Sequence, residues 1–308
     1  MNKTNKPTAN YSLKKYIFLF LCILILCATV PFHVSAKENT AAASASSDEK
    51  FIYEYGVFLS IDEENVSRLE KYHTIVIDAE YFSKKAIKKL KKEGHIVYTY
   101  LNIGSLETFR KDYPQYSQYC IGNYENWEEE QWVDVSQKEW QDRIKKLAQE
   151  YYKKGVDGFF IDNCDVYYFM GPELDGSTEQ KVSSEDLFQG LSTILKDLRT
   201  QYKKPVIING GDCFVSRCID EKYKLKNYFT AINQECVYTT IDFDQKKFKK
   251  AKAADTKYYE SYLKQVKKKG IRIYLLEYSK STKMTGTIQK KCNKKGYQYY
   301  VSRTIELK

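Results

Sequence analysis

Polar side chains stand at the end of six short, β-rich apolar runs of the sequence. These residues are Asp78, Asn102, Asp162, Asn209, Glu235 and Glu277. An Asp or Asn at any one such position commonly caps the next helix or makes a turn. Glu is a poor capping and turn residue, so Glu235 and Glu277 favour a chemical role. Six polar ends together predict a site built from carboxylates and amides.

Histidine, metal and cofactor chemistry have little support in the sequence. After the N-terminal segment the only histidines are His73 and His95, each at the start of an expected strand, where barrel residues serve stability. No Ser-His-Asp or Cys-His set can then be assembled. The cysteines lack Cys-x-x-Cys spacing, and there is no Gly-x-Gly-x-x-Gly pattern. We therefore expect carboxylate chemistry without a metal or a cofactor.

Two carboxylates facing each other across a glycosidic bond fit this residue set best. One carboxyl group, its pKa raised, protonates the leaving oxygen, while the other carboxylate attacks the sugar carbon or activates water. Asp162 and Glu235 end strands that are two apart in the expected sheet, so both would point into one mouth. Their expected separation of about 5 to 9 Å covers both retaining and inverting enzymes.

The elements that must position these residues repeat one unit, a short strand followed by a loop and an amphipathic helix. Strands are predicted at residues 55–60, 74–78, 96–102, 158–162, 206–209, 231–235, 271–277 and 298–301. Helices are predicted at residues 83–93, 137–154, 184–202, 258–269 and 282–295. Alternating strands and helices form a parallel sheet. Eight strands predict a (β/α)8 TIM barrel, whose active site lies at the C-terminal ends of the strands.

The longest connection, residues 104–132, follows the third strand and carries Trp127 and four of the chain's 28 tyrosines. Long connections in compact domains usually have a function, and aromatic faces suit sugar rings. We expect this segment to form a wall of the substrate site.

The N-terminal 36 residues have the pattern of a signal peptide. Four lysines precede an apolar run over 16–30, which is short for a membrane span, and Val34-Ser35-Ala36 follows it. Cleavage after Ala36 is preferred to an uncleaved anchor that would retain the protein at the membrane or the cell wall. Residues 37–50 then form a disordered spacer. Residues 51–308 form a single barrel domain, expected to be secreted, monomeric and free of stable membrane insertion.

The net charge of +10 lies mostly in lysine runs such as residues 84–92. The spacing of Ile87 and Leu90 favours a solvated helix face, and attraction to an anionic wall polymer or nucleic acid is the alternative. No aromatic residues interleave the runs, so a nucleic-acid groove is not expected. The six cysteines outside the signal form either one or two disulfides or buried thiols, and we slightly favour thiols.

With these residues laid out, the chain resembles glycoside hydrolase family 114, the endo-α-1,4-polygalactosaminidase type of barrel, over residues 55–307. The resemblance rests on motifs that occur in order at residues 98–105, 132–135, 155–165, 207–211, 233–236 and 277–278. The most specific is Gly-Val-Asp-Gly-Phe-Phe-Ile-Asp-Asn-Cys-Asp at 155–165.

The resemblance implies an endo-acting hydrolase of α-1,4-linked galactosamine polysaccharide, with Asp162 matching the nucleophile and Glu235 the acid/base. The residues expected to contact substrate are Asp78, Tyr100, Asn102, Asp165, Asn209 and Glu277. A chitinase-like enzyme would need a Glu just past the strand-four Asp, where this chain has Asn163. A catalytically inactive carbohydrate-binding or wall-associated barrel is the alternative, against which the two intact acids argue.

Overall fold

The computed structural model describes residues 51–125, 127–171 and 182–308. The expected signal peptide, 1–36, and spacer, 37–50, lie outside the described residues. Within the described part of the chain, no helix combines the length and apolar character needed to span a membrane.

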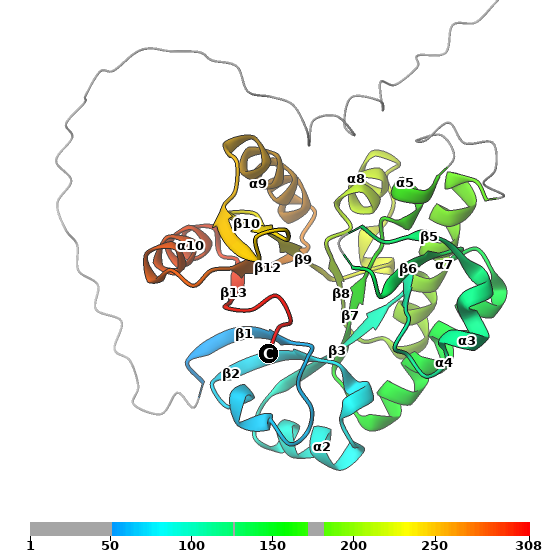
Figure 1. The fold of residues 1–308 in the computed structure, drawn as a ribbon, viewed down its shortest axis with the longest axis horizontal. Helices are drawn as coiled ribbons and strands as arrows, with labels where there is room; N and C mark the ends of the chain where they lie inside the picture. The colour runs from blue at the N-terminus through cyan, green and yellow to red at the C-terminus, as the bar shows by residue number, and fades with distance from the viewer. Residues whose placement is uncertain (1–50, 126, 172–181) are drawn as a thin grey trace, which may run out of the picture. The chain divides into compact units, whose positions relative to one another are not determined.

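Eight parallel strands form the central sheet of the protein (Figure 1). Their hydrogen-bonded order is β1 (Tyr53–Phe58), β2 (Tyr72–Ile77), β3 (Ile96–Asn102), β7 (Gly158–Asp162), β8 (Val206–Asn209), β9 (Ala231–Glu235), β12 (Arg272–Tyr278) and β13 (Gln298–Ser302). The larger helices outside it are α2 (Lys84–Lys92), α4 (Lys138–Lys154), α7 (Ser184–Tyr202), α9 (Ala253–Lys268) and α10 (Thr282–Lys295). The predicted TIM barrel and all eight predicted strands are confirmed.

The end strands β1 and β13 meet at a seam through their side chains. The ring of Phe58 on β1 lies 5.3 Å from the ring of Tyr300 on β13. Beyond the strands, the Ser60 amide donates a hydrogen bond to the carbonyl of Leu307 at 3.4 Å. The C-terminal segment therefore runs between these strands, where Figure 1 shows it in red.

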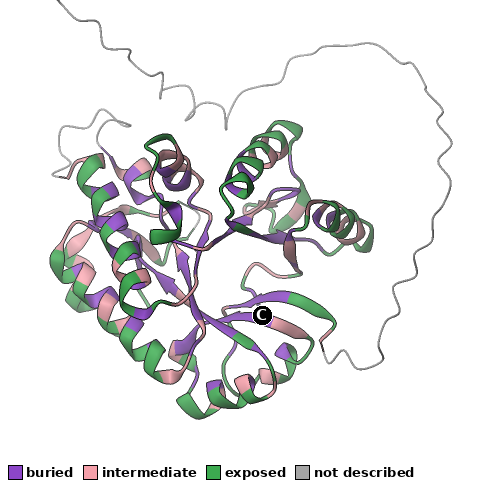
Figure 2. Cartoon of the chain, turned by 180° about the vertical axis from the view of Figure 1, so that it is seen from behind, coloured by how far each residue is buried: buried purple, intermediate pink, exposed green. Residues whose placement is uncertain are grey.

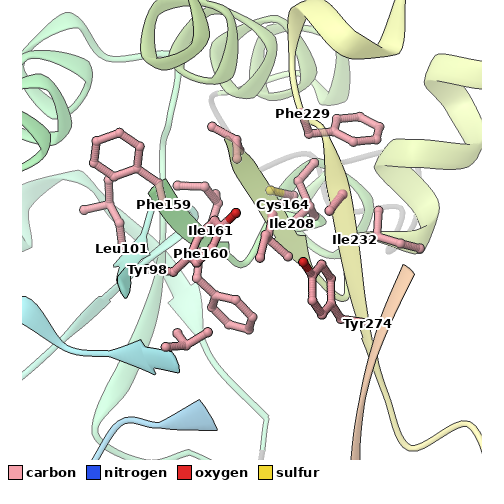
Figure 3. Packing of buried hydrophobic residues seen from close by; sticks show 14 of the residues in the cluster. Tyr98, Leu101, Phe159, Phe160, Ile161, Cys164, Ile208, Phe229, Ile232 and Tyr274 are labelled. Atoms are coloured by element: carbon pink, nitrogen blue, oxygen red, sulfur yellow. The ribbon is translucent and has the colours of Figure 1, made fainter. Parts of the chain in front are cut away.

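The core lies on both faces of the sheet, because successive side chains of a strand point to opposite sides. Inside the barrel, the rings of Tyr55 and Tyr274 are 4.6 Å apart, and Figure 3 shows Tyr274 among neighbours from β3, β7, β8 and β9. Figure 2 shows buried strands and helices that expose their outer faces. In the lysine-rich α2, Ile87 and Leu90 are the buried residues.

Several short elements were not predicted, most of them because they are too short to show a hydrophobic period. Two of them are the helices α5 (Val166–Met170) and α8 (Asp212–Asp220). Segment 104–132 contains the antiparallel sheet β4 (Ser105–Glu107), β6 (Glu130–Val133) and β5 (Cys120–Asn123), with α3 (Tyr113–Tyr116) and η3 (Ser117–Tyr119). A hairpin, β10 (Thr239–Asp242) and β11 (Lys247–Lys250), follows β9. The remaining 3-10 turns are η1 (Val66–Leu69), η2 (Ala79–Tyr81) and η4 (Leu225–Asn227).

The histidines and cysteines take structural positions. His73 and His95 lie at the N-terminal ends of β2 and β3, and Phe51 packs 5.3 and 5.0 Å from their rings. No disulfide is recorded among the six cysteines of the described chain, and Cys164, Cys218 and Cys292 are buried. These three match the buried thiols that the sequence slightly favoured, whereas Cys120, Cys213 and Cys236 are half-buried.

Candidate active site

A cavity of about 810 Å³ opens at the C-terminal ends of the strands. Six of the residues singled out in the sequence line it: Asp78, Tyr100, Asp162, Asp165, Asn209 and Glu235. Among its described lining residues are ten Asp and Glu side chains but only one basic side chain, Arg110. The cavity is therefore strongly acidic although the whole chain is basic.

Aromatic side chains from separate loops form the upper walls of the cavity. Trp127, from the connection between β5 and β6, packs edge-on against Phe243 of the β10–β11 hairpin, with ring centroids 6.0 Å apart. Phe169 of α5 stacks on Trp132 at 5.4 Å. Trp127 and Phe169 are 44% and 53% exposed, so each offers a ring face to a ligand. Segment 104–132 lies where a substrate wall was predicted.

The side-chain amide of Asn209 joins Asp162 to Glu235. Its Nδ2 donates to Asp162 Oδ1 at 3.0 Å and to Glu235 Oε1 at 2.7 Å. Because both oxygens bond to one nitrogen, they lie less than about 6 Å apart. Carboxyl groups of retaining glycosidases are about 5 to 5.5 Å apart, and those of inverting enzymes about 6.5 to 9.5 Å.

A hydrogen-bond chain through the barrel fixes the direction of that amide. Tyr55 donates from its hydroxyl to Asn233 Oδ1 at 3.0 Å. Asn233 Nδ2 in turn donates to Asn209 Oδ1 at 2.6 Å. Since the oxygen of Asn209 is occupied by this donor, its NH2 group must face the two carboxylates.

Asp162 is held from its C-terminal side by the backbone of Asn163, whose amide donates to Asp162 Oδ1 at 3.0 Å. Asn163 has a φ of 61°, in the left-handed region. Its carbonyl oxygen lies so close to Gly104 that a Cβ on Gly104 would sit 1.8 Å from it. Both donors to Asp162 reach Oδ1, which leaves Oδ2 for a reaction partner in the cavity.

Glu235 is held by Asn209 on one oxygen and by Tyr278 on the other. The Tyr278 hydroxyl donates to Glu235 Oε2 at 2.7 Å. Burial raises the pKa of Glu235, and the bonds from Tyr278 and Asn209 oppose that shift. Burial, with the charges of Glu130 and Glu235, raises the pKa of Asp162 to about 7. At neutral pH such a pair readily holds one proton between two acids.

Asp78 is paired with Arg110, the one basic side chain among the described residues of the cavity lining. Arg110 Nη1 donates to Asp78 Oδ2 at 2.8 Å and to Glu80 Oε2 at 2.6 Å, and its Nη2 donates to Glu107 Oε1 at 3.1 Å. The Tyr100 hydroxyl reaches the same Glu107 oxygen at 3.4 Å. Asp78 and Tyr100 thus lie in a charged network at one side of the cavity.

Asp165 directly precedes α5 and accepts a hydrogen bond from the amide of Phe214, in the first turn of α8, at 2.8 Å. Burial and the neighbouring Asp212 raise the pKa of Asp165 to about 8. Ligand atoms of Asp165, Asp212 and Cys213 lie within 4.8 Å of one another, which is the spacing of a metal site. This cluster is where a cation could be held.

Two residues predicted to contact substrate do not line the cavity. Glu277 is fully buried, and it accepts hydrogen bonds from the backbone amides of Tyr238 and Thr239, each at 2.9 Å. Asn102 lies under Glu130, to which its Nδ2 donates at 2.8 Å. Both side chains are bonded to neighbouring loops, and their direct contact with substrate stays a prediction.

The strand register explains why Glu277 lies outside the cavity. Leu276 pairs in register with Glu235, and both line the cavity. Because side chains alternate along a strand, Glu277 points away and Tyr278 points back to the cavity. Tyr278, the next residue along β12, lines the cavity in its place.

Sequence reasoning also missed Glu130, Asn163 and Asn233. Glu130 lies within the long insertion, where no strand end marked it. Asn163 and Asn233 stand inside recognised motifs, directly after Asp162 and two residues before Glu235. A polar residue at the inward-facing position before a strand end was a usable signal for Asn233.

Comparisons with known proteins place the chain among the glycoside hydrolases. Its fold is similar to the glycoside hydrolase domain of PelA from Pseudomonas aeruginosa, with a TM-score of 0.69 and 17% identity over 82% of this chain and 95% of that one. It is also similar to Aspergillus fumigatus Ega3 in complex with galactosamine, with a TM-score of 0.60 and 15% identity over 84% and 92%. A search of curated protein sequences found no match. A family model matches residues 34–307, so the chain belongs to glycoside-hydrolase family GH114.

Proposed function

We propose that this glycoside hydrolase cleaves α-1,4-linked galactosamine polysaccharide, with Asp162 as nucleophile and Glu235 as acid/base. The observation that carries the proposal is the Asn209 amide, which bonds to both carboxylates. The resulting separation of less than about 6 Å favours the retaining class over the inverting one.

In the first step, Asp162 Oδ2 attacks the anomeric carbon, and the bond from that carbon to the glycosidic oxygen breaks. The proton of Glu235 passes to the leaving oxygen, which leaves a glycosyl ester on Asp162 and a carboxylate on Glu235. In the second step, Glu235 takes a proton from water, and the resulting hydroxide attacks the same carbon and releases Asp162. In both steps the Asn209 amide donates a hydrogen bond to each acid and holds the two carboxyl groups in position.

The charge of the cavity supports an amino-sugar substrate. A deacetylated galactosamine residue carries an ammonium group, which ten carboxylates with a single Arg attract. The Ega3 structure holds galactosamine in a protein of similar fold. The exposed rings of Trp127 and Phe169 offer stacking faces for neighbouring sugars.

The N-terminal segment supports export of the enzyme. We propose that residues 1–36 direct secretion, that 37–50 form a spacer and that 51–308 are the catalytic domain. N-terminal sequencing of the protein from culture medium tests this, and a start at Lys37 is the expected result. A start at Met1 would contradict it.

The activity is tested by reducing-end release from α-1,4-galactosamine polymer at several degrees of acetylation. We expect activity in the wild type and a loss of at least about 1000-fold in kcat for Asp162→Asn and Glu235→Gln, because each removes a group that reacts. Asp142→Asn on the exposed face of α4 is the matched control and should keep full activity.

A wild type that releases nothing from any polymer contradicts the proposed substrate. Activity retained by both active-site variants contradicts the proposed roles. The inactive, carbohydrate-binding alternative predicts polymer binding without release of reducing ends.

A further inference from the structure

Glu130, at the start of β6, presents one oxygen to the protein and the other to the cavity. Its Oε1 accepts hydrogen bonds from Asn102 Nδ2 at 2.8 Å, from Asn163 Nδ2 at 2.7 Å and from the Ser105 hydroxyl. Among the described residues, no donor is recorded for Oε2, and Glu130 lines the cavity. The side chain is thus fixed in place with one oxygen available to a ligand.

The surroundings of Glu130 are negative. Asp162 is near enough that the charge of Glu130 raises the pKa of Asp162. Glu107 likewise raises the pKa of Glu130, after burial as the main cause. The guanidinium of Arg110 is bonded to Asp78, Glu80 and Glu107, so it does not neutralise Glu130.

The three bonds to Oε1 do not require a charge. A Gln side chain offers a carbonyl oxygen that accepts the same donors. A carboxylate at this place therefore adds only negative charge, beside another carboxylate in a partly buried site, and this costs stability. Such a charge is useful where a cationic group of the ligand binds.

We propose that Glu130 is a specificity-determining residue that binds the ammonium group of a deacetylated amino sugar beside Asp162. This rests on the proposed function, since it assigns the sugar that the reacting site takes. An ammonium group has three donors and no acceptor, which matches Glu130 Oε2. The neutral amide of an N-acetylated sugar lacks this attraction. The site therefore selects deacetylated residues at the bond to be cleaved.

The test compares galactosamine with N-acetylgalactosamine in the wild type, Glu130→Gln and Glu128→Gln. Glu128 is exposed on the same connection and does not line the cavity, so it is the matched control. Titration by NMR gives the affinity for each monosaccharide. We expect at least about a 10-fold preference for galactosamine in the wild type and in Glu128→Gln, reduced to less than about twofold in Glu130→Gln, as for loss of a charge-assisted bond.

Kinetics on deacetylated and acetylated α-1,4-linked hexamers give the second readout. Glu130→Gln should lose about 10- to 100-fold in kcat/KM on the deacetylated hexamer and stay within about twofold on the acetylated one. The acid limb of its pH profile should also move to lower pH, because a charge beside Asp162 is gone. The titratable groups around Glu130 and Asp162 are Tyr100, Glu107, Tyr124, Cys164, Glu235 and Tyr278.

The possible results separate this inference from the proposed function. An unchanged sugar preference in Glu130→Gln, equal losses on both hexamers, or no preference in the wild type overturns the inference. A wild type that cleaves neither hexamer but shows a Glu130-dependent preference for galactosamine overturns the proposed activity and keeps the inference. An equal fall in affinity for both sugars with a lower melting temperature assigns Glu130 a purely structural role.

Discussion

The ends of β7 and β12 each carry a buried acid, yet the two acids have different surroundings. Burial raises the pKa of both Asp162 and Glu277 to about 7. Glu277 uses both oxygens to accept bonds from the Tyr238 and Thr239 amides and the Thr239 hydroxyl. Asp162 accepts two bonds on Oδ1 alone. A raised pKa at a strand end therefore does not identify a reacting group. The hydrogen-bond donors around each carboxylate distinguish the two acids.

The difference follows from which way each side chain points. Asp162 is on the inner face of β7, where Asn209 and Glu235 meet it. Glu277 is on the outer face of β12, where the backbone after β9 turns and needs acceptors for its amides. Asp162, on the inner face, thus keeps Oδ2 open to the cavity, and Glu277, on the outer face, holds a loop.

The largest expected effect is on stability, from Glu277→Gln. The substitution puts an amide nitrogen in place of one carboxylate oxygen. This nitrogen faces the buried amide of Tyr238 or Thr239 and leaves that donor without an acceptor, which lowers the free energy of unfolding by about 2 to 4 kcal/mol. Thermal unfolding should show a fall in Tm on the order of 10 °C. The folded variant should keep kcat within about fivefold, because Glu277 does not reach the cavity.

Glu139→Gln on the exposed start of α4 is the control for Glu277→Gln and should leave Tm unchanged. An unchanged Tm with a loss of activity in Glu277→Gln would restore the role in substrate binding that the sequence predicted.

A smaller effect, about 10-fold in kcat, is expected for Tyr278→Phe. The lost hydroxyl no longer donates to Glu235 Oε2, and removal of a hydrogen bond to a carboxylate costs about 1.5 to 3 kcal/mol. Since that bond lowers the pKa of Glu235, its loss raises the pKa. An acid must be protonated to act, so the basic limb of the pH profile should move to higher pH.

Tyr299→Phe, on β13 and outside the cavity lining, is the matched control for Tyr278→Phe. A basic limb that stays in place, or moves to lower pH, would argue that Glu235 is not the acid.

The barrel could be predicted from the sequence because each strand is a short apolar run followed by a turn. The strand ends also located Asp162, Asn209 and Glu235, since all C-terminal ends of a parallel sheet meet at one mouth. Which face a strand-end residue occupies could not be predicted, because one residue of register decides it. This is why Glu277 was chosen over Tyr278.

The partners of the site depend on contacts between distant segments. Glu130 meets Asn163 across 33 residues, and Tyr55 meets Asn233 across 178. Local spacing carries no information about such pairs. The short helix α8 was missed for a different reason. Its N-cap is Gly211, without the capping side chain that Ser83 provides for α2, which is also nine residues long.

The smallest expected effect is the pH dependence of stability set by Asp162. Its pKa is raised from 3.8 to about 7, so the folded protein keeps a proton that the unfolded chain has released. The contribution of this proton to the free energy of unfolding is fully present below about pH 4 and is lost as pH rises through 7. Asp162→Asn cannot ionise, so its Tm should equal that of the wild type near pH 4 and exceed it by a few degrees at pH 8.

Thermal melts of both proteins between pH 4 and 9 measure this difference, and Asp142→Asn on the exposed face of α4 should show no gain at pH 8. A Tm difference that does not grow with pH would mean that Asp162 is already ionised at little cost. Its donors, Asn163 and Asn209, would then outweigh burial, and Asp162 would resemble Glu277 as a satisfied acid. A growing difference means that the site stores an unfavourable charge, which an incoming cationic sugar can relieve.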